Sequence, residues 1–475
     1  IQNIVLYKLN VTWCVNWICS SGHLNFTWLE FKRKRMIDMT YEDAYKYIKK
    51  AEGAGIVPGL STIKELLSRL GDPQDSVNVI HIAGTNGKGS IFAFLEYILR
   101  AAGYRVGRYI SPTIFTYLER FQINSRYMTE EEFAEIMEAV GGAASGMEAD
   151  GLNYPTAFEL ETAMAFLYFK KKKVDFLLLE TGMGGRLDAT NVVKKPLCTV
   201  LASISMDHMK FLGNDLSGIL REKMGIMRPG VPCVAYQLQE TLRPAYLEEC
   251  ERLAAPADMC DFSRIRITAI EKDYTEYIYD GKCYKIALNG LYQVYNSVVA
   301  IEVARCLNRY SGCSITDEQI KKGLAAARWK GRFEQVGSDP DIYIDGAHNV
   351  GGWQSLAQNV REYFKDKRLI YVCGVFKDKE YEKMLDIMAP YSDTLIAVTP
   401  PNEKRALPKE ALAQAAEKHF QNVYTAETAT EAVKKAVDLS RTDFVDGETG
   451  IQSREETVVL AFGSLSFIGE LSIGR

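Results

Sequence analysis

The sequence predicts an α/β protein of two domains: a P-loop-type doubly wound N-terminal domain with a small side β-sheet, and a smaller Rossmann-like C-terminal α/β domain. A glycine-rich stretch joins a buried strand to an apolar helix at residues 77–100. Strand and helix patterns alternate plainly after residue 334. At 475 residues the chain also exceeds what one hydrophobic core usually organises. We place the N-terminal domain at residues 36–329 and the C-terminal domain at residues 330–475.

The composition is that of a soluble globular protein. Hydrophobic residues make up 47% and charged residues 25% of the chain, and the formal net charge is −4. This mild balance gives no reason to expect nucleic acid or a membrane surface as a partner, and no apolar run reaches membrane-spanning length. The 10 cysteines have no paired spacing, which favours reduced thiols over disulfides. We expect a cytoplasmic protein, and a monomer.

Residues 1–35 differ from the rest of the chain. They hold three of the five tryptophans, show neither helical nor strand periodicity, and end in the basic run at residues 31–35. We expect this leader to be non-native or disordered, with the native start at Met36 or Met39. A targeting peptide is the alternative, but polar residues interrupt its apolar part and no convincing cleavage site follows.

The N-terminal domain divides into helix-like and strand-like segments. Apolar spacing predicts buried strands at residues 77–82, 105–110, 174–180 and 197–205. Helices are predicted at residues 41–50, 60–70, 91–100, 156–173, 294–308 and 316–327, with two more opening at Thr129 and around residues 221–226. Glycine and alanine at residues 141–151 predict a loop, and Pro112 predicts a non-helical connection across residues 111–124. Residues 231–290 alternate apolar and polar, which predicts the antiparallel strands of the side sheet.

The C-terminal domain shows a simpler rhythm. Strands are predicted near residues 342–345, 369–375, 394–399, 423–426 and 458–462, with helices between them. Regular strand–helix alternation of this kind is typical of a second doubly wound sheet.

The first strand is followed by a phosphate cradle. Its residues are Gly84, Thr85, Asn86, Gly87, Lys88, Gly89 and Ser90. The glycines let backbone N–H groups turn inward at a helix N-terminus, Lys88 adds a cation, and Ser90 offers a hydroxyl to Mg²⁺. The spacing departs from the standard P-loop, which has glycine at the position of Ile82 and Ser or Thr at that of Gly89. A turn that only joins strand to helix is the alternative, but it leaves Lys88 and Ser90 without a purpose.

Other candidate residues stand at strand ends or in apolar helices. Glu159 lies in an otherwise apolar helix, where a carboxylate needs a partner. His208 directly follows a buried strand, at the edge where ligands bind in open α/β sheets. Asp345 closes a strand of the C-terminal domain, with His348 just past it, and a carboxylate there suits ribose hydroxyls. A core or surface histidine at 208 and a plain turn at 345 are the alternatives.

Two long segments together resemble the signatures of a known family. Gly84–Ser90 and Glu180–Asn191 closely resemble those of the folylpolyglutamate and dihydrofolate synthases, which belong to the Mur-ligase superfamily. The resemblance runs from about Met39 to the C-terminus. Further matching segments follow in the family's order: Asp207–His208, Glu222–Ile226, Gly331–Glu334, Asp345–Asn349 and Gly463–Leu465.

The resemblance implies an ATP-dependent amide ligase. Such an enzyme adds L-glutamate to the terminal carboxylate of (tetrahydro)folate or its polyglutamates through an acyl phosphate, giving ADP and phosphate. ATP and Mg²⁺ are the implied cofactors, and dihydrofolate synthase activity on dihydropteroate is a second implication. Another Mur-type amino-acid ligase is disfavoured because the chain lacks an obvious extra N-terminal domain. A catalytically silent nucleotide-binding regulator is disfavoured because Glu159, His208 and Arg332 are all present.

The resemblance also implies roles for single residues. Lys88, the loop amides and Arg332 would contact the ATP phosphates. Asn296 would lie near the adenosine and Asp345 on its ribose, while His348 would lie close to the acyl-transfer centre. The implied Mg²⁺ ligands are Ser90, Glu159 and His208.

Lys223 lies where family members can carry a lysine carbamylated by CO₂. A carbamate would orient or ligate a nearby metal, whereas a bare ammonium would repel it. An unmodified lysine that pairs with Glu222 or solvent is the alternative. Two positions depart from the family's pattern, since Thr113 and Tyr292 stand where it usually has histidine. Thr113 lies in the loop that the resemblance places beside the folate site, so pterin binding is the least secure of the implied properties.

Overall fold

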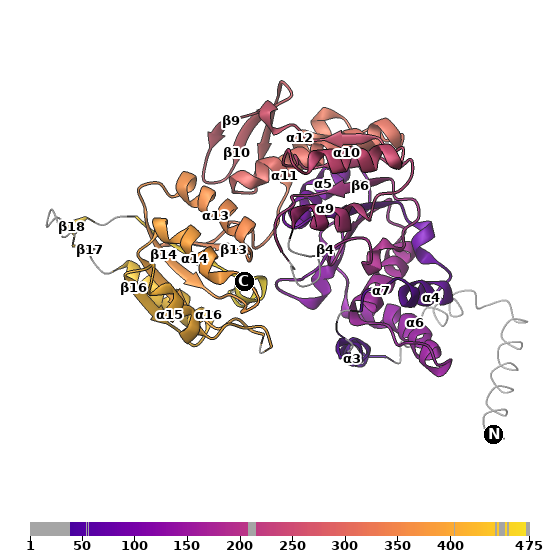
Figure 1. Ribbon diagram of the computed structural model, residues 1–475, viewed down its shortest axis with the longest axis horizontal. Helices are drawn as coiled ribbons and strands as arrows, with labels where there is room; N and C mark the ends of the chain where they lie inside the picture. Colours follow the sequence, from indigo (N-terminus) through magenta and orange to yellow (C-terminus); the bar gives the residue numbers. More distant parts are fainter. Residues whose placement is uncertain are drawn as a thin grey trace, which may run out of the picture.

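The computed structural model describes residues 39–471 apart from positions 54, 56, 208–214, 403, 442–443, 446–451 and 454–455. The expected leader and the start at Met36 lie outside the described residues, and so does His208. Two α/β lobes stand beside each other, the N-terminal one at the right and the C-terminal one at the left of Figure 1. The fold class predicted from the sequence is confirmed.

An eight-stranded sheet forms the centre of the N-terminal domain, in the order β4-β3-β2-β5-β1-β6-β7-β8. The pairs from β2 to β8 are parallel, while β3 and β4 form an antiparallel hairpin at one edge. The strands are β1 (Val79–Ala83), β2 (Val106–Tyr109), β3 (Phe121–Ile123), β4 (Arg126–Tyr127), β5 (Phe176–Glu180), β6 (Cys198–Leu201), β7 (Cys233–Ala235) and β8 (Ala257–Met259).

Helices cover both faces of this sheet, because its central strands are apolar on both sides. Ile80 and Leu178 point into a cluster shared with α5, α11 and α12, whereas Val79 and Leu177 point into one shared with α3, α4, α6 and α7. The helices are α3 (Tyr41–Glu52), α4 (Ser61–Arg69), α5 (Lys88–Ala101), α6 (Glu130–Ala149), α7 (Ala157–Lys172), α9 (Leu216–Met224), α10 (Arg243–Arg252), α11 (Leu291–Tyr310) and α12 (Asp317–Ala326).

A three-stranded antiparallel sheet flanks the N-terminal domain, in the order β11-β10-β9. Tyr277, Tyr284 and Ile286 are buried in the cluster that also holds α11 and α12, so this small sheet extends the core on that side. Its strands are β9 (Ile265–Ile270), β10 (Thr275–Tyr279) and β11 (Lys282–Ile286).

The C-terminal domain has a six-stranded sheet in the order β12-β13-β19-β14-β15-β16, parallel except for the edge strand β12. Trp353 and Leu385 belong to the core on one face and Ala432 and Phe467 to the core on the other. The strands are β12 (Glu334–Gly337), β13 (Asp341–Asp345), β14 (Arg368–Cys373), β15 (Thr394–Ala397), β16 (Asn422–Thr425) and β19 (Thr457–Phe462), with a separate ribbon of β17 (Phe444–Val445) and β18 (Gln452–Ser453). The helices are α13 (Val350–Tyr363), α14 (Tyr381–Met388), α15 (Lys409–Ala416), α16 (Ala429–Ser440) and α17 (Leu465–Glu470).

The loop predicted at residues 141–151 is wrong, because α6 continues through most of it. Gly141 approaches α3 so closely that a Cβ atom there would lie 2.7 Å from Cε1 of Tyr47. Ala144 and Met147 are buried in the same cluster. These small residues therefore serve close helix packing rather than reversal of the chain.

The prediction that residues 231–290 form antiparallel strands of a side sheet is wrong in its first half. There β7, α10 and β8 continue the parallel order of the main sheet, and only β9, β10 and β11 form the side sheet. The strand runs of β7 and β8 are three residues each, too short for their period to be distinguished. The hairpin of β3 and β4 and the edge strand β12 were also absent from the sequence prediction.

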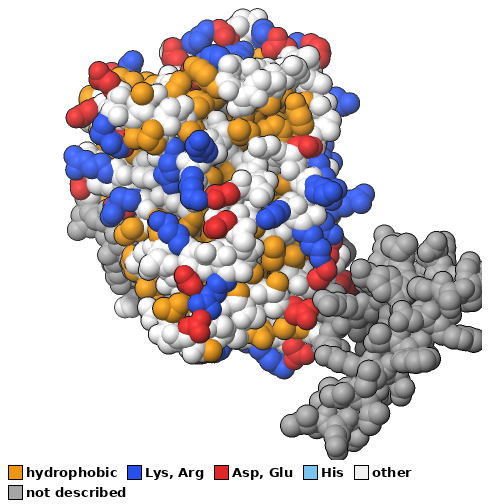
Figure 2. All heavy atoms as spheres, turned by 90° about the vertical axis from the view of Figure 1, so that its right-hand side faces the viewer, with side chains coloured by type: hydrophobic (Ala, Val, Ile, Leu, Met, Phe, Trp, Pro, Cys, Tyr) orange, Lys and Arg blue, Asp and Glu red, His pale blue; other side chains and the backbone are white. Residues whose placement is uncertain are grey.

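The surface carries both signs of charge. On the face at the right of Figure 1, Lys and Arg side chains intermingle with Asp, Glu and hydrophobic ones (Figure 2). Among the described residues, no helix has the length and hydropathy needed to cross a membrane. The domain boundary at residue 330 falls in the segment between α12 and β12, and this boundary, the monomeric state and the cytoplasmic location stay predictions.

Candidate active site

The phosphate loop connects β1 to α5. Gly87 has φ of 88°, a left-handed conformation, and a Cβ there would lie 2.6 Å from Oδ1 of Asn296. Glycine is therefore required at this position by conformation and by space. The preceding Thr85 ties the loop to the segment after β6, since its amide donates to Ser203 O at 2.8 Å and its hydroxyl to Ser205 O at 3.0 Å.

Lys88 opens α5 and lies across the loop. Its Nζ donates to the carbonyl oxygens of Gly84 at 3.1 Å and Thr85 at 3.4 Å. The same nitrogen lies 3.6 Å from Oε1 of Glu180, at the end of β5. Burial raises the pKa of Glu180, while the cations of Lys88 and then Arg332 act in the opposite direction. The loop thus combines oriented amides, a helix N-terminus and a cation with a buried carboxylate beside them.

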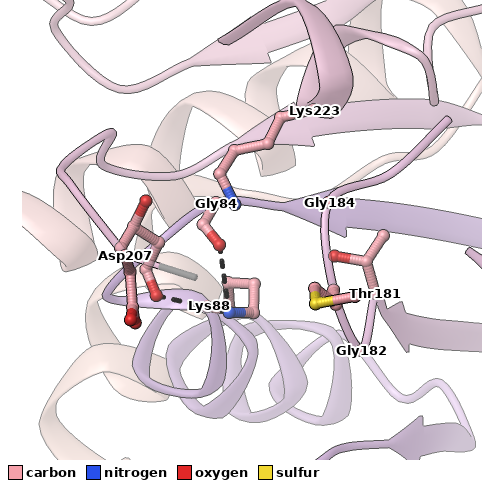
Figure 3. A pocket seen from close by; sticks show the side chains of 9 residues that line it. Gly84, Lys88, Thr181, Gly182, Gly184, Asp207 and Lys223 are labelled. Carbon is pink, nitrogen blue, oxygen red and sulfur yellow. Dashed lines mark hydrogen bonds between the residues drawn. The ribbon is translucent and has the colours of Figure 1, made fainter. Parts of the chain in front are cut away.

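A small cavity opens beside this loop (Figure 3). Both glycine-rich signatures contribute to it, together with a residue from the segment after β6 and one from α9. Its lining residues are Gly84, Thr85, Lys88, Thr181, Gly182, Met183, Gly184, Asp207 and Lys223.

Lys223 reaches the cavity from α9 and is 4% exposed. Burial, followed by the charge of Lys88, lowers the pKa of Lys223 to about 7, against the opposing carboxylates of Asp207 and Asp188. A lysine with this pKa is substantially neutral near pH 7. The side chain points towards Gly84 in Figure 3.

The second signature loop fixes the position of α9. Asp188 is buried and accepts hydrogen bonds from the amides of Met183 at 2.8 Å and Thr190 at 3.0 Å. Asn191 donates to the carbonyl oxygen of Gly225, just past the end of α9, at 3.0 Å. Gly185 packs so closely that a Cβ would lie 2.7 Å from the carbonyl oxygen of Glu222. The loop therefore holds the helix that carries Lys223 against the cavity.

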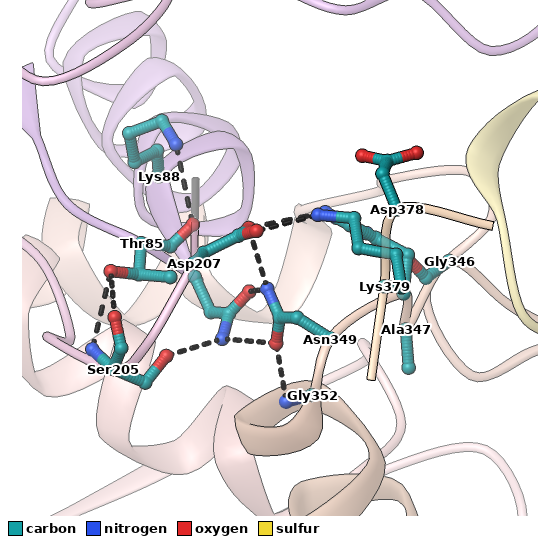
Figure 4. Close-up of polar contacts among 12 residues, drawn as sticks. Thr85, Lys88, Ser205, Asp207, Gly346, Ala347, Asn349, Gly352, Asp378 and Lys379 are labelled. Atoms are coloured by element: carbon teal, nitrogen blue, oxygen red, sulfur yellow. Dashed lines mark hydrogen bonds and ion pairs between the residues drawn. The ribbon is translucent and has the colours of Figure 1, made fainter. Parts of the chain in front are cut away.

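The C-terminal domain closes one edge of the site (Figure 4). Asn349 and Asn86 of the phosphate loop exchange two hydrogen bonds, at 3.0 and 3.1 Å. Asp207 accepts a hydrogen bond from Asn349 at 3.0 Å and one from Lys379 at 2.5 Å. Polar groups of both domains thus meet beside the cavity.

Asp345 is buried at the end of β13, and both of its oxygens accept hydrogen bonds. Tyr292 Oη and the Phe333 amide both donate to Oδ2 at 2.8 Å, and the Ala347 amide donates to Oδ1 at 2.8 Å. Burial raises the pKa of Asp345, opposed chiefly by Arg332. The tyrosine that departs from the family's histidine therefore serves as a hydrogen-bond donor that joins α11 to β13.

His348 lies two residues before α13. Its Nδ1 is 2.8 Å from the carbonyl oxygen of Gly346, so Nδ1 carries the proton, and Nε2 lies 3.9 Å from Oδ2 of Asp207. Burial, followed by the charge of Lys379, lowers the pKa of His348 to about 4. The imidazole is therefore neutral at pH 7 and keeps Nε2 available as a proton acceptor.

The structure brings most of the residues singled out from the sequence to this site. Gly84, Thr85, Lys88 and Lys223 line the cavity, and Asn86, Gly87 and Gly89 complete the loop. Asn296 lies under Gly87, and Arg332 approaches Glu180 and Asp345 closely enough to affect the pKa of both. His208 lies outside the described residues.

Two predicted metal ligands, Ser90 and Glu159, are not among the residues that line the cavity. Ser90 follows Gly89 in the first turn of α5, where it is buried. Oε2 of Glu159 accepts hydrogen bonds from the amide and the hydroxyl of Thr156, at 2.8 and 2.9 Å, in a capping box that begins α7. These hydrogen bonds of the capping box are the partners that a carboxylate in an apolar helix needs.

Glu180, Ser111 and Asp207 are site residues for which the sequence reasoning gave no role. Ser111 Oγ is buried without a hydrogen-bond partner among the described residues, and the Ser111 amide lowers the pKa of Glu180. Mg²⁺ prefers oxygen ligands and is commonly held by one or two carboxylates together with substrate phosphates, so this corner fits the ion. Among the described residues, no group of three His, Cys, Asp or Glu side chains is placed to hold a metal without a substrate. For Glu180, the available signal in the sequence was a charged residue at the end of the apolar strand at 176–180.

Comparison with known proteins agrees with this geometry. Residues 82–304 match the Mur ligase middle domain and residues 331–465 match the Mur ligase glutamate ligase domain. The fold and the phosphate loop thus define a Mur ligase. A dihydrofolate synthase/folylpolyglutamate synthase of Bacillus subtilis is 35% identical over 440 residues, which span 91% of this chain and 98% of the relative. The chain belongs to the family of folylpolyglutamate and dihydrofolate synthases.

Solved structures give the same result. A Mycobacterium tuberculosis folylpolyglutamate synthase complexed with ADP and AMPPCP is 30% identical, with a TM-score of 0.81 over 91% of this chain and 99% of that one. E. coli FolC in complex with DHPP and ADP is 26% identical, with a TM-score of 0.77 over 92% of this chain and 97% of that one. Both lobes of this chain therefore have counterparts of known structure.

Proposed function

We propose that this protein uses ATP to add L-glutamate to the terminal carboxylate of (tetrahydro)folate, giving ADP and phosphate. The observation that carries the proposal is one cavity lined by Lys88 and Lys223 and closed at its edge by the second domain, in a chain of this family. Named relatives of the family share the activity, among them the folylpolyglutamate synthase of Lacticaseibacillus casei, 30% identical over 78% of this chain and 88% of its own.

The first step makes a leaving group. The folate carboxylate attacks the γ-phosphorus of ATP, and the bond from that phosphorus to the oxygen of the β-phosphate breaks. ADP leaves, and an acyl phosphate of folate remains. Lys88 and the loop amides stabilise the charge on the transferring phosphoryl group, and positioning with electrostatics supplies most of the catalysis in such transfers. Arg332, on the facing domain, is proposed to contact the same phosphates.

The second step forms the amide. The amine of L-glutamate attacks the acyl carbon, phosphate leaves, and one proton must depart from the nitrogen. We propose that Nε2 of His348 accepts that proton, because it is unprotonated at pH 7 and lies at the edge where the two domains meet, 3.9 Å from Oδ2 of Asp207. A general base works best with a pKa near the working pH, so this role requires the pKa of His348 to rise from about 4 when the anionic substrates bind. Closure of the two domains excludes water, which would otherwise hydrolyse the acyl phosphate.

Asn296 and Asp345 are proposed to hold the nucleoside. Asn296 lies against the phosphate loop, 2.6 Å from a Cβ placed on Gly87, which suits a contact near the adenosine. Asp345 ends a strand of the facing domain, and its Oδ1, which accepts the Ala347 amide, has a second lone pair that a ribose hydroxyl can use. Its existing hydrogen bonds to Tyr292 and two amides fix the orientation of the carboxylate.

Mg²⁺ supplies neutralising charge on the transferring phosphoryl group when bound. We propose that Glu180 and Ser111 hold it, with His208 retained from the sequence prediction. Glu180 replaces Glu159 in this role because it lies beside Lys88, whereas Glu159 caps α7. Ser111 replaces Ser90 because its buried hydroxyl lacks a partner among the described residues.

Lys223 is proposed to be carbamylated. Carbamate formation needs a neutral amine, which adds to CO₂ with loss of one proton. Burial beside Lys88 provides that amine near pH 7. The product exchanges a buried cation for an anion with two acceptor oxygens, a better neighbour for a metal–phosphate centre.

The decisive experiment compares ADP release with L-glutamate plus tetrahydrofolate and with L-glutamate plus dihydropteroate. Glutamate-dependent ADP release with tetrahydrofolate supports the proposal, and release with both acceptors assigns dihydrofolate synthase activity as well. ATP binding without release of ADP in either mixture would instead favour the nucleotide-binding regulator.

A further inference from the structure

The carboxylate of Asp207 is shared between the cavity and the second domain. The residue lines the cavity, and its side chain is 7% exposed. Lys379 Nζ donates to Oδ1 at 2.5 Å, and Asn349 Nδ2 donates to Oδ2 at 3.0 Å (Figure 4). Both donors belong to the C-terminal domain, so two interdomain hydrogen bonds converge on one side chain.

Asn349 extends this contact to the phosphate loop. It exchanges two hydrogen bonds with Asn86, and its Oδ1 also accepts the amide of Gly352 at 2.8 Å as the N-cap of α13. A displacement of α13 would therefore disturb Asn86 in the loop. The phosphate loop also contacts the segment after β6, which carries Asp207, because Asn86 donates to Oγ of Ser205 at 3.2 Å.

The pair of Asp207 and Lys379 is the charged part of this contact. The Lys379 side chain is 9% exposed and that of Asp207 is 7% exposed, so both charges of the pair are largely removed from water. A buried ion pair of this kind confers little stability by itself, and in some proteins its role is to specify one relative arrangement of the groups that carry it. Here those groups are the cavity wall and the loop after β14.

The two domains are also joined by a second, neutral contact. Asn359 accepts the amide of Leu291 at 2.8 Å, and Tyr363 Oη accepts the amide of Gly290 at 3.1 Å. Because α13 thus supplies the caps at the start of α11, loss of the Asp207–Lys379 pair leaves the domains attached on this side.

We propose that Asp207 and Lys379 form an interdomain latch whose role is to position the C-terminal domain over the phosphate cavity for attack by the amine. Both are positioning residues for the second half-reaction. The inference rests on the proposed function for its catalytic consequence. Without the latch, the acyl phosphate still forms, but water competes with glutamate and yields carboxylate and phosphate instead of the amide.

The test measures phosphate released per amide formed, together with KM for each substrate, in Lys379→Met, Lys379→Arg and Asp207→Asn. Lys377→Met is the matched control, since Lys377 lies exposed in the same loop. We expect Lys379→Met to release severalfold more phosphate than amide and to raise KM for L-glutamate at least tenfold, with KM for ATP within about twofold. Lys379→Arg should restore coupling, and Lys377→Met should behave as the unaltered protein.

Small-angle scattering without substrates tests the latch independently of catalysis. Lys379→Met should broaden the distribution of interatomic distances, and Asp207→Asn should add nothing when combined with it. Thermal unfolding verifies that the variants are folded. A coupled reaction, an unchanged KM for glutamate and an unchanged scattering profile in Lys379→Met would overturn the inference. If the unaltered protein ligates neither acceptor, the proposed function fails, and the scattering comparison still decides the latch.

Discussion

Lys88 Nζ lies 3.6 Å from Oε1 of Glu180, and strand register brings the two together. Ile82 of β1 pairs with Glu180 of β5 in the parallel sheet, so the carboxylate ends one strand beside the loop that follows the other. Lys88 also donates to two carbonyl oxygens of its own loop. A cation held in this way can turn from protein oxygens to phosphate oxygens without leaving the loop.

Replacing Lys88 with alanine should reduce turnover by about 10²–10³-fold, the usual effect of removing one preorganised charge-stabilising donor. The fold should persist, because Glu180 can take up a proton at its raised pKa once its cation is gone. ADP release measures the effect, and circular dichroism monitors the fold. Lys64→Ala, at an exposed position of α4, is the control. Near-normal turnover in Lys88→Ala would exclude it from the mechanism.

Glu180→Gln and Glu159→Gln distinguish two assignments of the metal ligand. Glu180→Gln should raise the Mg²⁺ concentration needed for half-maximal activity by about tenfold or more, the usual cost of a lost metal contact. Glu159→Gln should keep the Mg²⁺ requirement and lose at most about 1 kcal/mol of stability through the weakened cap. Magnesium titration and thermal unfolding provide the readouts. The reverse pattern would restore the assignment made from the sequence.

Lys223→Ala should lose activity, and short carboxylic acids such as acetate should restore part of it. The physical reason is that a free carboxylate can occupy the space of the carbamate. In the unaltered protein, ¹³C-labelled bicarbonate should give a carbamate resonance that Lys223→Ala lacks, which is a readout independent of turnover. Because the pKa of Lys223 is about 7, carbamate formation should weaken as the pH falls below 7 and the amine becomes protonated. Full activity of Lys223→Ala in CO₂-depleted buffer would contradict the idea.

The free energy of unfolding should depend on pH through His81. It is fully buried in β1, its Nε2 lies 2.9 Å from Oγ1 of Thr190, and burial lowers the pKa of His81 to about 3. The unfolded chain takes up a proton near pH 6.5 but the native protein does not, so stability is lost as the pH falls from 6.5 towards 3. Its contribution is about 1.4 kcal/mol per pH unit in that window.

His81→Gln should remove this contribution to the slope of the unfolding free energy against pH, while keeping a side chain that can form a hydrogen bond with Thr190. Denaturant unfolding at several pH values from 7 to 4 measures it. If the slope of unfolding free energy against pH is unchanged in His81→Gln, His81 takes up its proton in the native protein as it does in the unfolded chain. His348 should add a similar slope that ends nearer pH 4, since its pKa is lowered to about 4.

Local patterns determined much of this protein. The phosphate loop, the apolar strands before and after it, and the capping box at Thr129 are each written in a few consecutive residues, and the structure has all of them. Glycine spacing and apolar periodicity act over one turn or one strand, so a sequence displays them directly. The alternation in the C-terminal domain was readable for the same reason.

Only the tertiary structure decided what each buried charge does. Glu159 and Glu180 both follow or interrupt apolar runs, yet one caps α7 and the other faces Lys88, because strand register sets their neighbours. Gly141 reads locally as a loop, but the approach of Tyr47 on another helix makes it a packing position. The hydrogen bonds between Asn86 and Asn349, 263 residues apart, depend on how two lobes with separate hydrophobic cores pack against each other. Contacts at that separation leave no local period, since their partners are chosen by packing and by the burial of charge.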